Sequence, residues 1–289
     1  MIITIASGKG GTGKTLLATG LAGVAAGGRS GVNLLDCDVE EPNAHLFLKP
    51  EIARTEDVTT PVPCIDLARC TFCGRCAQVC AFHALAVVRD RVLVFPELCH
   101  GCGSCSLHCE AGAITEEQRH LGRIEYGRAG AVRFAHGLLD VGQAMATPVI
   151  RQLKRRAIPA HSRSTVVLLD APPGNACPVV ETLRGSDYAL LITEPTPFGL
   201  HDLVIAVETA RDELGLPVGV VVNRDGVGDQ GVEEFCARAD IPILLRIPMD
   251  RRIAEAYSEG RLWVEALPEY RQPLRDLLRE VALRAGGSR

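Results

Sequence analysis

A nine-residue loop near the N-terminus constrains the fold of this chain more than any other stretch. Residues 7–15 read SGKGGTGKT, follow an apolar run at residues 2–6 and precede a segment rich in Ala and Leu. The loop fits the pattern G-x-x-x-x-G-K-[ST] with Gly8, Gly13, Lys14 and Thr15. In this pattern, backbone N–H groups at a helix N-terminus surround phosphate oxygens. The sequence therefore predicts a nucleotide site, with Lys14 on the β- and γ-phosphates and the Thr15 hydroxyl on Mg²⁺.

Lysine usage points to the same loop. Only four of the 31 lysine and arginine residues are lysines, namely Lys9, Lys14, Lys49 and Lys154. Two of the four lie in this loop, which indicates sites for a compact ammonium group that a planar guanidinium would not fit. The minimal pattern does not require Lys9, so Lys9 needs an explanation of its own.

The run from Gly8 to Thr15, GKGGTGKT, resembles the deviant Walker A loop of the MinD/ParA/Mrp branch of P-loop ATPases, which includes the nitrogenase iron protein. In that branch the first lysine of the loop crosses a dimer interface to the partner's nucleotide. The resemblance implies an ATP-dependent homodimer in which Lys9 acts in trans. It also implies that Gly10, Gly11 and Thr12 take part in nucleotide binding. A solvated loop lysine is the alternative for Lys9.

Whole-chain properties narrow the class of protein. The 289 residues can hold one large α/β domain or two smaller ones. A net charge of -4 and a pI near 6.1 argue against binding nucleic acid through bulk electrostatics. No apolar run approaches the roughly 18 residues of a membrane span, and the chain starts directly with an expected strand, so we expect a cytoplasmic protein. Twelve cysteines there indicate metal rather than disulfides.

Two carboxylates follow buried strands at the crevice end of an open α/β sheet. Asp38 comes just after the apolar run 32–35, and Asp170 ends the apolar run 165–169 and precedes Ala-Pro-Pro-Gly. The same resemblance makes the first stretch switch I, in which Asp38 positions the attacking water. It makes the second stretch Walker B and switch II, in which Asp170 holds Mg²⁺ through water. Capping of the next element is the alternative for Asp38.

Later strands are expected at residues 188–193 and 218–223, with a helix at about 199–214 between them. Asn223 ends the second of these strands at the crevice, where the family places an Asn that reads adenine. Pro248 and Asp250 resemble the second loop on the adenine side. These three residues are therefore expected to bind the base.

Eight cysteines form two matching runs. The spacing C-x₂-C-x₂-C-x₃-C occurs at Cys70, Cys73, Cys76 and Cys80, and again 29 residues later at Cys99, Cys102, Cys105 and Cys109. This is the pattern of bacterial ferredoxins with two clusters, in which the fourth Cys of each run ligates the other cluster. One [4Fe–4S] cluster is expected on Cys70, Cys73, Cys76 and Cys109. The second is expected on Cys99, Cys102, Cys105 and Cys80.

The usual Pro after the fourth Cys is replaced by Ala81 and Glu110, which puts the reduction potentials in doubt more than the clusters. Residues 84–95 are expected to form a β-hairpin between the runs. Zinc is the weaker alternative, since it would leave four of the eight thiolates idle. A further Cys, Cys177, lies at the offset from Asp170 where the nitrogenase iron protein bridges a cluster between subunits, but an ordinary buried thiol is the commoner role.

The expected organisation has three parts. Residues 1–58 and 119–289 form the two parts of the ATPase domain, and residues 59–118 form an inserted ferredoxin domain, with a boundary in the polar stretch 55–63. Residues 119–163 form a basic connector with a hairpin at 122–134 and a helix at 142–156. Its positive charge suits a helix C-terminus, and docking of an acidic redox or scaffold partner is the alternative. An amphipathic tail from Pro268 is expected to pack on the sheet rather than on a membrane.

The fold class expected is therefore α/β: a mostly parallel, doubly wound P-loop sheet with an inserted small α+β ferredoxin domain of the bacterial type. The chain resembles MinD-superfamily ATPases that carry such an insert. This implies slow, partner-stimulated hydrolysis of ATP with Mg²⁺, and two [4Fe–4S] clusters. Because both halves of the nucleotide site flank the insert, we expect ATP-dependent electron transfer first. The alternatives are a metal or Fe–S carrier, and a ParA/MinD-like spatial organiser with a redox-sensing or docking module.

Overall fold

The computed structural model describes residues 1–28, 31–159 and 165–286. The strands are β1 (Ile2–Ala6), β2 (Gly31–Asp36), β3 (Glu51–Ile65), β4 (Leu85–Val88), β5 (Arg91–Val94), β6 (Ile114–Ala129), β7 (Val132–Leu139), β8 (Thr165–Asp170), β9 (Tyr188–Thr193), β10 (Val218–Asp225) and β11 (Ile243–Pro248). The α-helices are α1 (Lys14–Ala25), α2 (Ala44–Leu48), α3 (Arg75–Gln78), α4 (Ser104–Leu107), α5 (Thr147–Ala157), α6 (Cys177–Leu183), α7 (Pro197–Val207), α8 (Gly231–Arg238), α9 (Arg251–Ser258), α10 (Trp263–Ala266) and α11 (Arg271–Gly286). Within this part of the chain no helix is both long and apolar enough to cross a membrane.

A nine-stranded sheet forms the centre of the molecule, in the order β11-β10-β9-β1-β8-β2-β7-β6-β3. The seven strands from β11 to β7 are parallel, and β6 and β3 add an antiparallel edge. Parallel strands covered on both faces read as continuous apolar runs, as residues 165–169 and 188–192 do. The predicted mostly parallel α/β sheet is confirmed.

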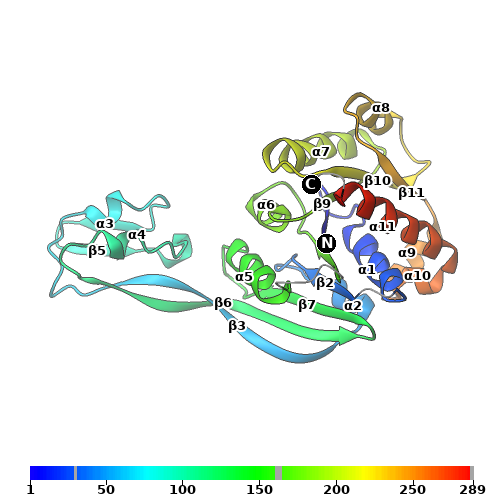
Figure 1. The fold of residues 1–289 in the computed structure, drawn as a ribbon. Helices are drawn as coiled ribbons and strands as arrows, with labels where there is room; N and C mark the ends of the chain where they lie inside the picture. Colours follow the sequence, from blue (N-terminus) through cyan, green and yellow to red (C-terminus); the bar gives the residue numbers. More distant parts are fainter. Residues whose placement is uncertain (29–30, 160–164, 287–289) are drawn as a thin grey trace.

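Helices cover both faces of the parallel strands (Figure 1). One face packs against α1, α10 and α11, with Leu17, Trp263 and Leu274 in one buried cluster. The other face packs against α6, α7 and α8 near β9 and β10, and against α5 near β2 and β8. The tail helix α11 buries Leu274, Leu277 and Val281, so its apolar stripe faces the core.

The polar stretch at residues 55–63, where we expect a domain boundary, lies within the strand β3. β3 and β6 form one long antiparallel ribbon, paired from Glu51–Arg128 to Ile65–Ile114. The expected domain borders at 58/59 and 118/119 therefore fall inside these two strands. The composition is polar because much of the ribbon is exposed, and Pro61 and Pro63 are tolerated because β3 is the edge strand of the sheet.

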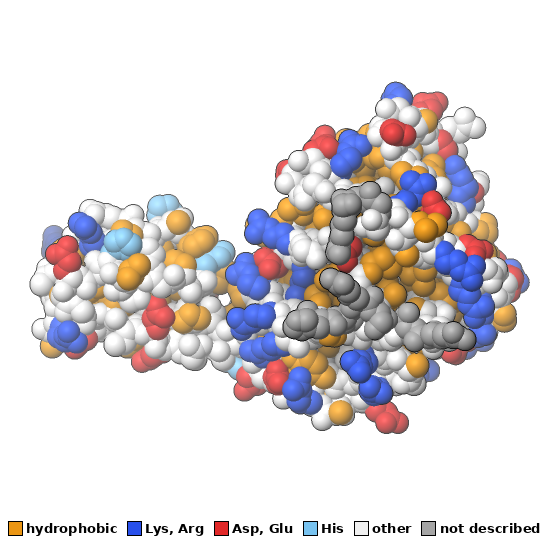
Figure 2. Space-filling view, viewed as in Figure 1, with side chains coloured by type: hydrophobic (Ala, Val, Ile, Leu, Met, Phe, Trp, Pro, Cys, Tyr) orange, Lys and Arg blue, Asp and Glu red, His pale blue; other side chains and the backbone are white. Residues whose placement is uncertain are grey.

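At its far end the ribbon carries residues 66–113, here called the cysteine module (Figure 1). The part of the chain outside the ribbon and the module is called the body. The module holds α3, α4 and the predicted hairpin, which is confirmed as β4 and β5. Figure 2 shows it as a separate mass beside the body. Its buried apolar cluster has only five members: Cys80, Ala84, Leu85, Cys99 and Cys105.

The helix α5 joins the ribbon to the body. The sequence predicts a helix in the basic connector at residues 142–156, and α5 spans Thr147–Ala157. Gln152 donates to the Thr59 carbonyl at 2.8 Å, and Arg156 donates to the Asp57 carbonyl at 3.0 Å. On its other side Arg151 pairs with Glu181 of α6 at 2.9 Å. Most cations of the connector thus have partners within the chain, which weakens the expectation of a docking face. Residues 160–163 of the connector lie outside the described residues.

Candidate functional site

A cavity of about 510 Å³ opens at the carboxyl ends of the parallel strands. The predicted nucleotide residues that line it are Gly10, Gly11, Gly13, Lys14, Thr15, Asp38, Asn223, Pro248 and Asp250. The lining residues to which sequence analysis gave no role are Leu16, Glu41, Asn43, Pro173, Arg224, Met249, Ile253, Ala254 and Tyr257. Five segments far apart in the sequence thus meet where the sheet presents its ligand crevice.

Two glycines of the loop are required by close packing. A Cβ at Gly8 would lie 2.5 Å from the Asp202 carbonyl oxygen on α7, so only glycine lets the loop approach that helix. Gly13 has φ 103° and precedes α1, and a Cβ there would lie 2.6 Å from Nδ2 of Asn223. Close packing and backbone conformation, rather than contact with a ligand, therefore explain why residues 8 and 13 are glycines.

Lys14 is the buried cation of the loop, with 7% of its surface exposed. Its ammonium donates to the Ser7 hydroxyl at 3.0 Å and to the Lys9 carbonyl at 3.2 Å. Burial lowers the pKa of Lys14, and the nearby Asp170 and Asp38 carboxylates oppose that shift. Lys9 points elsewhere, since its ammonium lies 3.5 Å from a carboxylate oxygen of Glu194.

Asp170 meets a simple test for a Mg²⁺ site. Its side chain is 1% exposed, and within the described part of the chain neither carboxylate oxygen accepts a hydrogen bond. Burial, with Asp36 beside it, raises the pKa of Asp170 well above its usual range. The Thr15 hydroxyl and the Lys14 ammonium oppose this rise only in part, so a hydrated divalent cation would supply further donors and positive charge to this buried carboxylate. The residues present therefore fit the ion.

Asp36 organises the switch I loop, a role that sequence analysis missed. Its carboxylate accepts the backbone N–H groups of Asp38, Asn43 and Ala44 at 3.1, 2.9 and 2.9 Å. Burial nevertheless raises the pKa of Asp36 to about 7. Asp38 faces the cavity, and burial raises its pKa to about 6. The available signal was an Asp at a strand end followed by a loop whose N–H groups need an acceptor.

The adenine-side residues lie in the cavity wall but already have partners in the chain. Asn223 is 7% exposed, donates to the Thr12 carbonyl at 2.8 Å and accepts from the Arg224 N–H at 3.0 Å. It thus supports the phosphate loop directly. Asp250 caps α9 through the Arg252 N–H and also pairs with the Arg252 side chain, which lowers its pKa to about 2. Pro248 ends β11 beside them.

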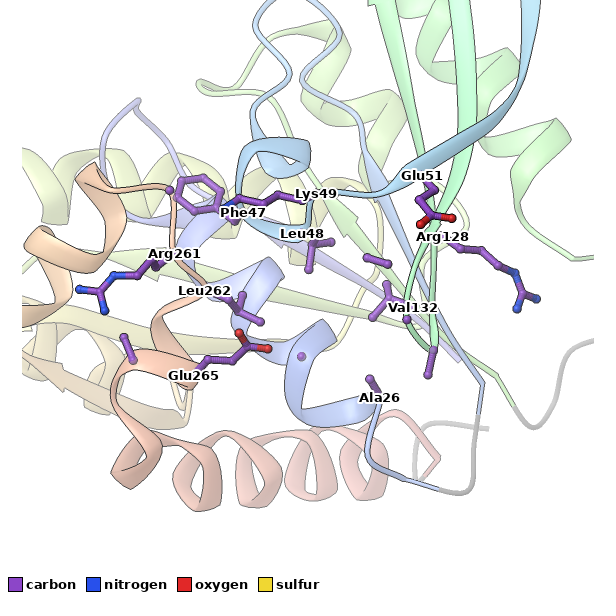
Figure 3. Close-up of a pocket in the computed structure, with 16 residues that line it drawn as sticks. Ala26, Phe47, Leu48, Lys49, Glu51, Arg128, Val132, Arg261, Leu262 and Glu265 are labelled. Atoms are coloured by element: carbon purple, nitrogen blue, oxygen red, sulfur yellow. The ribbon is translucent and has the colours of Figure 1, made fainter.

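A larger cavity of about 960 Å³ lies away from these groups (Figure 3). It is lined by Ala26 at the C-terminal end of α1, whereas the phosphate loop precedes the N-terminal end of the same helix. Lys49, Arg128 and Arg261 share its wall with Glu51 and Glu265, so the lining charge is mixed. Its chemistry selects no ligand, and the smaller cavity remains the candidate site.

The structure brings the two predicted sets of cysteines around two separate small cavities. Cys70, Cys73, Cys76 and Cys109 line one, and Cys80, Cys99, Cys102 and Cys105 line the other. Each set takes three cysteines from one run and one from the other. Gly74 and Gly103, with φ 77° and 73°, introduce α3 and α4 in matching positions.

Backbone N–H groups approach the sulfurs in both sets. Ala84 N–H donates to Sγ of Cys80 and Ala113 N–H to Sγ of Cys109, both at 3.3 Å. All twelve cysteines are free, and Cys177, the first residue of α6, is exposed. Among the residues that the structure describes, no three His, Cys, Asp or Glu side chains are grouped so as to hold one metal ion. Metal clusters are therefore not shown by the structure.

Comparison with known proteins places the chain beside a family of nucleotide-binding domains. The model of the CobQ/CobB/MinD/ParA nucleotide binding domain matches residues 3–263. The uncharacterized protein MJ0579 of Methanocaldococcus jannaschii is 29% identical, over 98% of this chain and 96% of its own length.

Solved structures share the fold at low sequence identity. The septum site-determining protein MinD of Pyrococcus horikoshii, complexed with Mg-ADP, has a TM-score of 0.59 and 19% identity over 97% of this chain and 95% of its own. MinD in the MinC:MinD cell division complex of Aquifex aeolicus has a TM-score of 0.56 and 18% identity over 98% of this chain and 95% of that chain. These likenesses concern the fold.

Proposed function

The chain belongs to the CobQ/CobB/MinD/ParA family of nucleotide-binding domains and is an ATPase of the MinD/ParA type, and we propose that it binds Mg-ATP in the 510 Å³ cavity. The observation that carries this proposal is the buried carboxylate of Asp170, which has no hydrogen-bond partner in the described chain and influences the pKa of the P-loop Lys14. The Mg-ADP of the Pyrococcus horikoshii MinD structure suits the same type of site.

Each group has a task in this proposal. Lys14 exchanges its bonds to Ser7 and the Lys9 carbonyl for phosphate oxygens, which costs little because the ammonium is already desolvated. Thr15 would hold Mg²⁺ directly and Asp170 would hold it through water, and the ion would supply positive charge for the phosphates. Asp38 orients the attacking water, and its raised pKa makes it a better proton acceptor than an exposed Asp.

The rest of the loop and the base side complete the proposed site. Gly8, Gly10, Gly11, Thr12 and Gly13 shape the backbone around the phosphates. Asn223 has one amide N–H left for the base, and Pro248 and Asp250 border the same space. Lys9 acts on the nucleotide of a second protomer, so the ATP state is a homodimer with slow, partner-stimulated hydrolysis.

Equilibrium binding of a fluorescent ATP analogue, with and without Mg²⁺, tests this site. We expect binding that Mg²⁺ strengthens and that Asp170→Asn reduces at least tenfold, since one carboxylate–metal interaction is worth more than 1.4 kcal/mol. Asp276→Asn on α11, an exposed carboxylate that does not line the cavity, is the matched control and should bind normally. Binding that ignores both Mg²⁺ and Asp170→Asn would remove the basis of the proposal.

We also propose that residues 66–113 form an inserted domain that holds two [4Fe–4S] clusters, one on each set of four cysteines. Three features support it: the crossed pairing of the two runs around two cavities, the N–H groups that approach Cys80 and Cys109, and the five-residue apolar cluster. A module this small with so little core is usually stabilised by metal or disulfides, and all its cysteines are free.

The lack of a single-ion site in the described residues does not conflict with this proposal. Each thiolate of a [4Fe–4S] cluster ligates a different iron, so the four sulfurs surround a whole cluster rather than converge on one ion. A zinc site, by contrast, needs four ligands on one ion. The proposal therefore predicts iron and inorganic sulfide, not zinc.

For the biological role, we infer a MinD/ParA-like ATPase whose cysteine module serves redox sensing or docking, in preference to ATP-gated electron transfer. The family match and the MinD folds favour this alternative. The ribbon also carries the module away from the switch loops, whereas gating of electron flow needs clusters close to them (Figure 1). The eight cysteines keep electron transfer as the second candidate and cluster delivery as the third.

One experiment separates the three roles. The holoprotein is titrated by EPR with no nucleotide, with ADP and with a non-hydrolysable ATP analogue. The sensing or docking role predicts unchanged potentials together with redox-dependent ATPase activity. A potential that shifts with nucleotide selects electron transfer, and iron that passes to an apo-ferredoxin selects delivery.

A further inference from the structure

Glu194 emerges beside the phosphate loop and is held in a rigid turn. It follows β9, which pairs with β1, the strand that leads into the loop. Its carbonyl accepts the Thr196 N–H at 2.8 Å, and a side chain at Gly199 would collide with that carbonyl. Thr196 in turn caps α7 by accepting the Gly199 N–H at 3.0 Å. These contacts fix the backbone at Glu194. Glu194 therefore cannot shift to keep its contact if a side chain that pairs with it moves away.

The Glu194 carboxylate is bound by two cations, one on each oxygen. Oε2 lies 3.5 Å from Lys9 Nζ, and Oε1 lies 2.7 Å from a guanidinium nitrogen of Arg224. The Glu194 side chain is 10% exposed, while those of Lys9 and Arg224 are 33% and 51% exposed. The fixed member of the cluster is thus the buried anion, and the mobile members are the cations.

Both cations belong to the nucleotide site. Lys9 lies in the phosphate loop, and its carbonyl accepts from Ser7 and Lys14. Arg224 lines the 510 Å³ cavity next to Asn223. A bound triphosphate would attract the same two side chains, because phosphate oxygens carry more negative charge than one carboxylate. Glu194 and the nucleotide therefore compete for Lys9.

We propose that Glu194 is a positioning residue that holds Lys9 away from the phosphates until nucleotide binds, and so sets the affinity for nucleotide. This inference rests on the nucleotide site proposed above. In the nucleotide-free protein, Lys9 pairs with Glu194 of the same chain. In the bound state Glu194 keeps Arg224 alone, and Lys9 contacts the phosphates of the second protomer's nucleotide, as proposed above.

The test is a double-mutant cycle on the full chain with Mg-ATP. Glu194→Gln keeps the shape and removes the charge, so we expect about two- to fivefold tighter binding, the size of one partly exposed ion pair. In a Lys9→Ala background the same substitution should change the affinity by less than about 1.5-fold. Glu181→Gln on α6 removes an equal charge far from the cavity and should leave the affinity unchanged.

A structural role for Glu194 would lower the melting temperature without any dependence on Lys9. If Glu194→Gln fails to fold, Glu194→Asp replaces it: the charge stays but no longer reaches Lys9, so binding should again tighten only when Lys9 is present. Unchanged affinity, or a gain that survives Lys9→Ala, overturns the inference while the nucleotide site stands. Failure of the wild-type chain to bind Mg-ATP overturns the proposed function itself.

Discussion

The body and the cysteine module of this chain are stabilised in different ways. The body buries continuous apolar strands between two layers of helices, with side chains such as Ile3, Leu17 and Leu34 fully buried. The module exposes large apolar residues such as Leu67 and Leu107, and three of the five members of its buried cluster are cysteines. The body thus contains a large core of its own, whereas the buried apolar cluster of the module is small and consists mostly of cysteines.

We therefore expect the two regions to respond independently, the body to loss of nucleotide and the module to loss of the proposed clusters. The body has a preformed site whose loop is braced by Asn223 and by α7 even without nucleotide. The module is joined to it by one ribbon, which α5 fastens through Gln152 and Arg156. Four perturbations, in order of decreasing expected effect, would break or sharpen this contrast.

Removal of metal should have the largest effect, and only on the module. Chelation under reducing conditions is expected to make residues 66–113 sensitive to protease while Mg-ATP affinity changes less than about twofold, because the body does not use the clusters for folding. Limited proteolysis with mass spectrometry locates the cuts. Cys105→Ala should act like partial chelation, and Cys236→Ala, outside both sets, should not. A module that resists protease without metal would remove the contrast.

Loss of Lys14 should act only on the body. Lys14→Ala is expected to weaken Mg-ATP binding at least about a hundredfold, because it removes a desolvated charge that meets the phosphates. Iron content should stay at the wild-type value. Lys49→Ala, a lysine in the wall of the other cavity, is the matched control for calorimetry. Normal ATP binding by Lys14→Ala would mean that this loop is not the phosphate site.

Lys154 fastens α5 to α6, and its loss should destabilise the body moderately. Its ammonium donates to the Glu181, Thr182 and Arg184 carbonyls at 2.6, 2.7 and 2.6 Å, so all three of its hydrogens cap the end of α6. Lys154→Met should lower the free energy of unfolding by about 1–3 kcal/mol, measured by denaturant titration. Arg155→Met, at an exposed neighbour, should change it by less than about 0.5 kcal/mol.

The pH dependence of the nucleotide-free body should follow its carboxylates with raised pKa values, Asp36, Asp38 and Asp170, and substitution isolates the share of Asp36. Its folded-state pKa is raised to about 7, so the folded protein holds this proton more tightly than the unfolded chain does. Stability from this group is therefore present at low pH and lost as pH rises from about 4 towards 7, by at most about 1.4 kcal/mol per pH unit. Thermal melts between pH 5 and 7.5 measure the slope. Asp36→Asn should flatten it, and a steeper slope in the variant would contradict the assignment.

The sequence predicted the local features of the site well. The glycine pattern around Lys14 and the apolar run before Asp170 specify a loop and a strand by nearest neighbours. That Asp170 lies close enough to Lys14 to affect its pKa then follows from the order of the parallel strands. The two groups of cysteines around the two cavities agree with those expected from the ferredoxin-type pattern, and their ligation of clusters stays a prediction. The hairpin at residues 84–95 was also found.

Long-range features were not predictable. The polar, proline-containing stretch at residues 55–63 reads as a linker, and only its pairing with β6 makes it a strand. The position of the cysteine module relative to the loops after Asp38 and Asp170 depends on that ribbon. The pairing of Lys9 with Glu194 depends on chain segments brought together by folding, for which one sequence carries no signal.

Native mass spectrometry of the anaerobically purified full chain with Mg-ATP tests the central claim most directly, because one spectrum counts nucleotide, clusters and subunits. We expect one nucleotide and two [4Fe–4S] clusters per chain, and dimers of the chain in the presence of Mg-ATP. A spectrum of bare or zinc-loaded chains without nucleotide would contradict it.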